Sequence, residues 1–182
     1  YKSAELLARK VARKYPNSLN YQLQVGIAQL KAGDTKKSEK TFKKVTSKVD
    51  GNRSQAINLA NTFNRYSLFE KALNIYLLAE KLNPKNNFGN QKGQLYGQLG
   101  KPDLMISEYL NELSLDPRQK QQVLNKLQKF LDNDGIKSDK NYQLVKKQLL
   151  PLVRLEKERS DFTEILIWLF MQNHQFEMAL RQ

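Results

Sequence analysis

A repeat of about 34 residues is the feature that most limits how this chain of 182 residues can fold. Pro16, Asp50, Pro84 and Pro117 lie 34, 34 and 33 residues apart. Each closes a similar phrase. A small or medium residue is followed four positions later by an aromatic or small one, and eight positions after that by the proline or aspartate. A fixed period of this length predicts a stacked array of helix hairpins, in which each unit packs mainly on its neighbours.

The spacing of apolar residues predicts helices almost throughout the chain. Apolar side chains recur every three or four residues, which is typical of amphipathic helices, and strand patterns are scarce. Each unit is expected to run as helix, tight turn, helix and break, with a left-handed turn at Gly33. Leu7 is expected on the inward stripe of the first helix. Pro151 is expected to kink or split the helix predicted over residues 141–156.

These residues resemble the tetratricopeptide repeat family. The second unit has Phe63, Ala72, Tyr76 and Pro84 in the places of the family's motif, and the run Phe69-Glu-Lys-Ala72 is especially typical of it. The resemblance implies an all-α fold: a right-handed α-α superhelix (solenoid) of stacked antiparallel helix hairpins. It also implies a function in protein binding or scaffolding.

The resemblance divides residues 1–182 into one continuous array. We expect residues 1–16 to be the second helix of a truncated unit, and residues 19–52, 53–85 and 86–118 to be full repeats. Residues 119–159 are expected to form a degenerate helix pair with a longer loop, and residues 160–182 a truncated terminal unit. An array that begins and ends in mid-unit is expected to belong to a longer chain.

The motif also predicts which residues let the two helices of a hairpin touch. Small residues are expected at these contacts, and aromatic residues are expected to fill the gaps between neighbouring helices. Met105 stands where the family has a small residue, so the third hairpin is expected to be splayed. The predicted small residues are Gly26, Ala60 and Gly93, and the aromatic ones include Phe42, Tyr76 and Tyr109.

Ligand peptides of this family usually lie in a concave groove lined by the first helix of each unit. The corresponding places here are rich in side-chain amides, which can pair with both the N–H and the C=O groups of an extended peptide. The alternative is that these amides are ordinary exposed polar residues. The predicted peptide-groove residues are Gln24, Asn58, Asn61, Asn64, Arg65, Asn87, Asn90, Gln91, Gln94 and Gln98.

The family's best-known groove chemistry is a clamp of lysine, asparagine and arginine on a C-terminal carboxylate. Leu23 and Ile27 occupy two of the places where the first unit would need lysine and asparagine. We therefore predict that the groove has no carboxylate clamp, although Leu23 and Ile27 themselves are expected to face it.

The net charge of +13 favours acidic partners. Most lysines are scattered along the helices, and the densest group, between residues 36 and 48, is expected to be a solvated outer face. An alternative function is a basic surface that contacts anionic lipid or nucleic acid, and another is the repeat region of a larger envelope or regulatory assembly protein. Nucleic acid is disfavoured because the aromatic residues occupy core places rather than an exposed stacking platform. Nothing in the sequence specifically indicates a membrane ligand.

The composition offers little for catalysis. There is no cysteine, the one histidine is His174, and no nucleophile, paired-carboxylate or phosphate-loop pattern is present. We expect no enzymatic activity, no cofactor and no metal. The stretch Asp132-Asn-Asp134-Gly135 has a partial likeness to a calcium loop, but a plain turn is the better interpretation.

Targeting and assembly are weakly marked. The sequence has no signal peptide, and its longest apolar run is the seven residues Ile165–Met171, so no transmembrane helix is expected and the localisation is unknown. The residues around Trp168 are expected to be core. If they are partly uncovered, they offer a surface for self-association.

Overall fold

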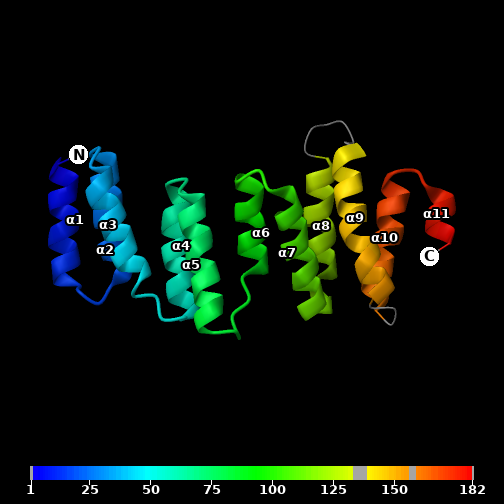
Figure 1. The fold of residues 1–182 in the computed structure, drawn as a ribbon, viewed down its shortest axis with the longest axis horizontal. Coiled ribbons are helices and arrows are strands. Elements are labelled where there is room, and N and C mark those ends of the chain that lie inside the picture. The colour runs from blue at the N-terminus through cyan, green and yellow to red at the C-terminus, as the bar shows by residue number, and fades with distance from the viewer. Residues whose placement is uncertain (1, 133–138, 156–158, 182) are drawn as a thin grey trace. The chain divides into compact units, whose positions relative to one another are not determined.

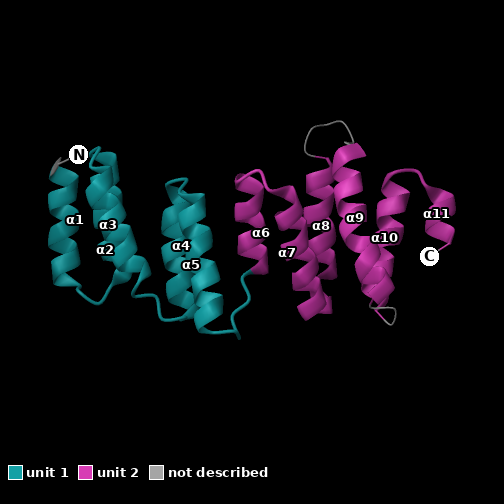
Figure 2. Cartoon of the chain, in the orientation of Figure 1, with its two compact units in different colours: residues 1–88 teal, residues 89–182 magenta. Residues whose placement is uncertain are grey.

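A computed structural model describes residues 2–132, 139–155 and 159–181 of the protein. Over these residues the protein consists of α-helices and one short 3₁₀ turn, with no β-strand, which confirms the all-α prediction (Figure 1). The chain divides into two compact units, residues 1–88 and residues 89–182 (Figure 2).

The helices follow one another in hairpins. Unit 1 contains α1 (Lys2–Lys14), α2 (Leu19–Lys31), α3 (Thr35–Thr46), α4 (Arg53–Arg65) and α5 (Phe69–Leu82). Unit 2 contains α6 (Gly89–Gln98), α7 (Pro102–Leu115), the 3₁₀ turn η1 (Pro117–Gln119), α8 (Lys120–Leu131), α9 (Asp139–Leu155), α10 (Ser160–Gln172) and α11 (Phe176–Leu180). Consecutive helices pack on each other, as α2 does on α3 and α6 on α7.

The hairpins share one close helix contact. A Cβ atom at Gly26 would lie 2.6 Å from a ring carbon of Phe42, and one at Gly93 would lie 2.3 Å from a ring carbon of Tyr109. Both pairs are 16 residues apart in the sequence. Only glycine leaves room for the ring at this distance, so the predicted contact between small and aromatic residues is confirmed in both hairpins. The same spacing joins Ala60 to Tyr76, and both of these residues are buried.

The turn inside each hairpin repeats as well. Gly33, Ser67, Gly100 and His174 each adopt a positive φ, between 56° and 83°. In every case the next residue donates its N–H to the carbonyl five positions earlier, as Asp34 does to Gln29 and Gln175 does to Phe170. This bond and the left-handed residue before it form a Schellman motif, which ends the first helix and starts the second. The recurrence of the motif in α2–α3, α4–α5, α6–α7 and α10–α11 supports an internal repeat.

Polar contacts hold the loops of unit 1 together. The side-chain amide of Asn86 donates to the carbonyl of Gly51 at 2.8 Å, which joins the loops that follow α5 and α3. The guanidinium of Arg53 donates to the carbonyl of Asn87 at 2.9 Å and lies over the ring of Phe88, 4.9 Å from its centroid. Phe88 is fully buried against Tyr76, so the chain after α5 is fixed to the start of α4.

The core of unit 2 runs through α7, α8, α9, α10 and α11. Its fully buried members include Leu113, Leu127, Leu149 and Phe162. Arg159 joins the ends of this core, because its guanidinium donates to the carbonyls of Leu113 and Ser114 at 2.8 Å and pairs with Asp161. The last turn of α7 thus gains donors for carbonyls that a helix end leaves open.

Three sequence expectations are corrected by these packing details. Leu7 is 63% exposed, so it does not lie on the covered stripe of α1. Pro151 does not split its helix, because α9 continues from Asp139 to Leu155. The hairpin of Met105 is closely packed rather than splayed, since Gly93 touches Tyr109 and Gly97 makes room for the Met105 sulfur. Residues 133–135 of the predicted plain turn lie outside the described residues.

Candidate protein-binding surfaces

Helix α4 carries a buried stripe and an exposed amide face. Ala56, Leu59, Ala60 and Phe63 are almost completely buried. Four predicted groove residues are exposed on the rest of the helix at spacings of three, three and one: Asn58, Asn61, Asn64 and Arg65. Within the described part of the chain, the side chains of these three asparagines make no hydrogen bond. Their amide groups are therefore open to solvent or to a partner.

Helix α2 lies beside α4 and contributes less to this face than expected. Gln24 is half-buried, but Leu23 and Ile27 are buried in the core, so their expected places in the groove are wrong. The neighbouring Asn20 accepts a hydrogen bond of 2.8 Å from the Thr62 hydroxyl of α4. This buried threonine fixes one predicted repeat to the next, and the sequence pattern gave no sign of it.

The other predicted groove residues divide between the two units. Asn87 belongs to unit 1 and is half-buried, with its carbonyl bound by Arg53. Asn90 and Gln91 are half-buried on α6, whereas Gln94 and Gln98 are exposed. The Gln94 amide donates to Asn90 at 3.4 Å. The structure thus groups Gln24, Asn58, Asn61, Asn64, Arg65 and Asn87 in unit 1, and Asn90, Gln91, Gln94 and Gln98 in unit 2.

Two of these residues line a cleft within unit 2. Gln94 and Gln98 face a space of about 700 Å³ that is also lined by residues of α7 and α8. The ammonium group of Lys126 lies 4.8 Å from the ring centroid of Tyr109 and 3.3 Å from a carboxylate oxygen of Glu112. Burial raises the pKa of the Tyr109 phenol, and the charge of Glu112 raises it further, so the phenol stays neutral. The sequence did not predict the α8 residues of this lining, Lys126, Lys129 and Phe130.

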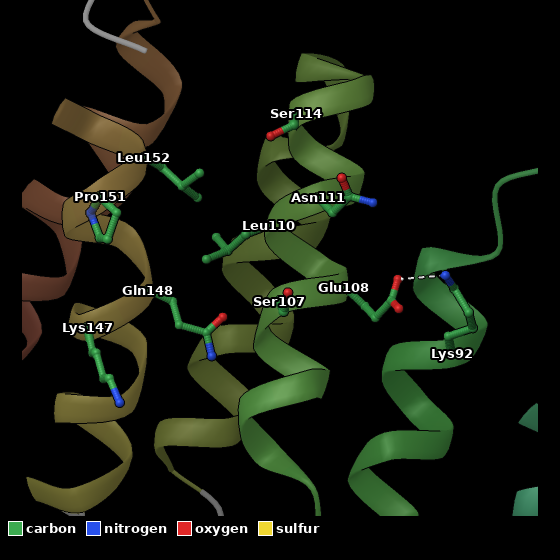
Figure 3. Close-up of a pocket in the computed structure, with 10 residues that line it drawn as sticks. All are labelled: Lys92, Ser107, Glu108, Leu110, Asn111, Ser114, Lys147, Gln148, Pro151 and Leu152. Atoms are coloured by element: carbon green, nitrogen blue, oxygen red, sulfur yellow. Dashed lines mark ion pairs between the residues drawn. The ribbon is translucent and has the colours of Figure 1, made fainter. Parts of the chain in front are cut away.

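A second cleft of unit 2, of about 500 Å³, lies between α7 and α9 (Figure 3). Leu110 and Leu152 lie on its two walls, and Gln148 donates to the carbonyl of Asp103 at 2.8 Å. Pro151 lacks an N–H, so it cannot donate to the carbonyl of Lys147, the residue one turn earlier on the same wall. These walls combine apolar surface with backbone and side-chain hydrogen-bonding groups.

The polar groups at this cleft form an ion pair rather than an acid–base set. The Lys92 ammonium lies 3.0 Å from a Glu108 carboxylate oxygen, and both side chains are largely buried (Figure 3). Ser107 and Ser114 also line the cleft. Across residues 2–132, 139–155 and 159–181, no group of three or more histidine, cysteine or acidic side chains could hold a metal ion. The chain's one histidine, His174, is exposed in the turn between α10 and α11.

The apolar residues around Trp168 are mostly core. Phe162, Ile165, Leu166, Leu169 and Phe170 are fully buried in unit 2. Trp168 itself is half-buried, so only a small part of the apolar group faces outward. Self-association through this region stays a prediction.

The densest group of lysines lies on α3, where residues 36, 37, 40, 43, 44 and 48 are all exposed, as expected for a solvated face. Among the described helices, none is long and apolar enough to cross a membrane. Comparisons with protein-family models and with curated proteins find no match to this chain.

Proposed function

We propose that this chain is a tetratricopeptide-like helical array that binds an extended segment of a partner protein through the amide-bearing faces of α4 and α6. The observation that carries the proposal is the exposed face of α4, where Asn58, Asn61 and Asn64 have no intramolecular side-chain hydrogen bond to any described residue. Three such amides along one helix offer a row of paired donors and acceptors. A peptide backbone presents the same groups in alternation.

The repeated geometry supports the array. The Schellman turns after α2, α4, α6 and α10 recur, and so does the contact between a glycine and an aromatic ring 16 residues later. Such hairpins leave one side of each first helix open when the other side is buried, as α4 illustrates. Binding rather than catalysis is the function that this arrangement favours.

The test measures peptide binding by the intact chain. An array of immobilised peptides of random sequence is probed with the protein, and the peptides that bind are measured in solution by fluorescence anisotropy. Replacing Asn58 and Asn61 with alanine is expected to weaken binding about tenfold, because each lost amide removes hydrogen bonds of about 0.5–1.5 kcal/mol. The exchange Asn90→Ala with Gln94→Ala tests α6 in the same way.

Matched controls separate the groove from a general loss of polar surface. Asn74 on α5 and Gln143 on α9 are exposed amides of the same chemistry outside the predicted groove. Alanine at these two positions is expected to leave the affinity unchanged. If the α4 and α6 variants bind as well as the original protein, the groove assignment is wrong.

A further inference from the structure

A basic cleft in unit 1 lies on a different side of α2 from the amide face. Its volume is about 520 Å³, and its walls come from α1 and α3 with α2 between them. Gln22 and Val25 of α2 line the cleft. Gln24, the predicted groove residue, is about half a turn around the helix from Gln22 at about 100° per residue. The cleft is therefore separate from the surface of the proposed function.

Four positive side chains surround this cleft. Arg9 and Arg13 lie one turn apart on α1, Lys44 lies on α3, and Lys48 lies just beyond the end of α3. All four are exposed, and no lining residue carries a carboxylate. Glu5 partly neutralises Arg9 through a hydrogen bond of 2.8 Å, and Lys48 lies 3.4 Å from the Gln22 amide oxygen. Arg13 and Lys44 make no ion pair with any described residue.

This arrangement has a cost for the free protein. Like charges one helical turn apart repel by a few tenths of a kcal/mol, and here two such pairs face one another across a cleft. An anionic occupant would remove the repulsion and form several charge pairs at once. The cleft is thus better suited to a negatively charged ligand than to empty solvent.

The rest of the lining indicates which anion fits. Ala12, Pro16, Val25 and Val45 give the cleft apolar surface between its charged walls, and no aromatic side chain lines it. A nucleic-acid strand would leave this apolar surface against phosphates and would find no ring for base stacking. A membrane presents a broad surface that does not enter a recess between two helices. A peptide can place an apolar side chain in the cleft while its carboxylates reach both walls.

We infer that the cleft between α1 and α3 binds an acidic segment of a partner protein, in which an apolar residue is flanked by carboxylates. Arg13 and Lys44 are the principal charged contacts, because the other two cations already have a partner within the chain. Thr41 and Gln22 offer hydrogen-bonding groups for the peptide backbone between them.

The experiment uses a fluorescein-labelled peptide with one leucine flanked on each side by two glutamates, and measures its anisotropy with the intact chain. The double exchange Arg13→Glu with Lys44→Glu is expected to weaken binding at least about tenfold, because two attractive pairs become repulsive. The control exchange Lys36→Glu with Lys40→Glu alters the net charge equally on the same helix outside the cleft. It is expected to change the affinity less than about twofold at physiological salt, because separated surface charges are screened there.

Two further measurements test the composition of the ligand. A peptide with serine in place of leucine is expected to bind several-fold more weakly, because the apolar contact is lost. A peptide with glutamine in place of every glutamate is expected not to bind. The milder exchange Arg13→Gln with Lys44→Gln, checked by thermal unfolding, should weaken binding without lowering stability, since it relieves repulsion.

Several outcomes would overturn the inference. Equal weakening by the cleft variant and the control variant would mean that only net charge matters. Absence of peptide binding would remove the assignment. Vesicles of phosphatidylcholine with phosphatidylserine, and a single-stranded DNA oligonucleotide, are measured in parallel. If either binds through Arg13 and Lys44 while the peptide does not, the occupant is an anionic lipid or a nucleic acid instead.

Discussion

At the scale of single residues, Gly93 and Gly97 lie one turn apart on α6 and would respond differently to a side chain. A Cβ at Gly93 would lie 2.3 Å from a ring carbon of the buried Tyr109, whereas one at Gly97 would lie 3.2 Å from the flexible Met105 sulfur. Gly93→Ala is therefore expected to lower the free energy of unfolding by about 1–3 kcal/mol, as overpacking does. Gly97→Ala is expected to be neutral or to stabilise by up to about 1 kcal/mol, because alanine favours a helix.

Urea unfolding followed by circular dichroism measures both variants. The two exchanges are matched, since each adds one methyl group to the same helix. Equal losses of stability would contradict the close contact between α6 and α7 at Gly93. The same contact in unit 1 predicts that Gly26→Ala destabilises through Phe42, whose ring carbon would lie 2.6 Å from the added atom.

The residue Asp116 gives a prediction on pH. Hydrogen bonds from the Arg118 side chain, the shorter of them 2.8 Å, hold the pKa of the Asp116 carboxyl at about 2, below its ordinary 3.8. Because the folded-state pKa is the lower one, this interaction stabilises the fold above pH 3.8 and is lost as the pH falls towards about 2. Asp116 is exposed to water at its carboxyl, so the effect is expected to be small.

Urea unfolding of the original chain and of Asp116→Asn tests this dependence. The original chain is expected to be the more stable of the two near neutral pH, and the difference is expected to narrow by about pH 2. A difference that stays constant across this range would show that the Asp116 carboxylate does not act through its charge. A carbon-detected NMR titration of the carboxyl group measures the pKa directly.

At the scale of the helices, the turn between α4 and α5 departs from its counterparts in using serine. Ser67 has a φ of 57°, where the equivalent turns have Gly33 and Gly100. A left-handed conformation costs a non-glycine residue about 1–2 kcal/mol, and glycine loses part of this gain through its freer unfolded chain. Ser67→Gly is therefore expected to stabilise the protein by up to about 1 kcal/mol.

The control is a serine at another helix end. Ser47 follows α3 with a φ of −67°, so glycine there brings no conformational relief and is expected to destabilise. Thermal unfolding of the two variants should shift in opposite directions. A fall in melting temperature for Ser67→Gly would mean that the turn depends on the serine side chain.

The elements show what the sequence could predict and why other features escaped it. Helices, breaks and the pairing of Gly26 with Phe42 follow from local propensity and from the 34-residue period. The left-handed turns at Ser67 and His174 could not be predicted from residue type, because packing of the two flanking helices imposes them. The burial of Leu23 and Ile27 was missed because the family's groove places were carried over without allowing for the contact between α2 and α4.

The candidate sites show the same division. Exposure of Asn58, Asn61, Asn64 and Arg65 follows from the periodicity of one helix. The basic cleft was not predicted, since Arg13 and Lys44 are 31 residues apart and only the packing of α1 and α3 brings them to one space. Clefts built from several helices need tertiary structure, whereas the face of a single helix does not.

At the scale of the whole molecule, 31 basic side chains outnumber 18 acidic ones. A net charge of +13 implies self-repulsion in the folded state, where charges are closer together than in the unfolded chain. Several exposed lysines of α3 add to it at spacings of one turn, among them Lys36 with Lys40 and Lys40 with Lys44. Ion pairs such as that of Lys71 with Glu39 at 2.7 Å act in the opposite direction, but they are fewer than the unpaired cations.

Sodium chloride is therefore expected to stabilise this protein. Raising its concentration from about 0.01 M to about 0.15 M shortens the screening length from about 30 Å to about 8 Å, so it weakens repulsion across the molecule more than contact ion pairs. We expect the melting temperature to rise by a few degrees. The variant Lys36→Gln with Lys40→Gln should be more stable at low salt and gain less from added salt, because part of the repulsion has been removed. A melting temperature that falls with salt would instead mean that ion pairs dominate, and an equal gain in the variant would mean that salt acts by another route than the α3 charges.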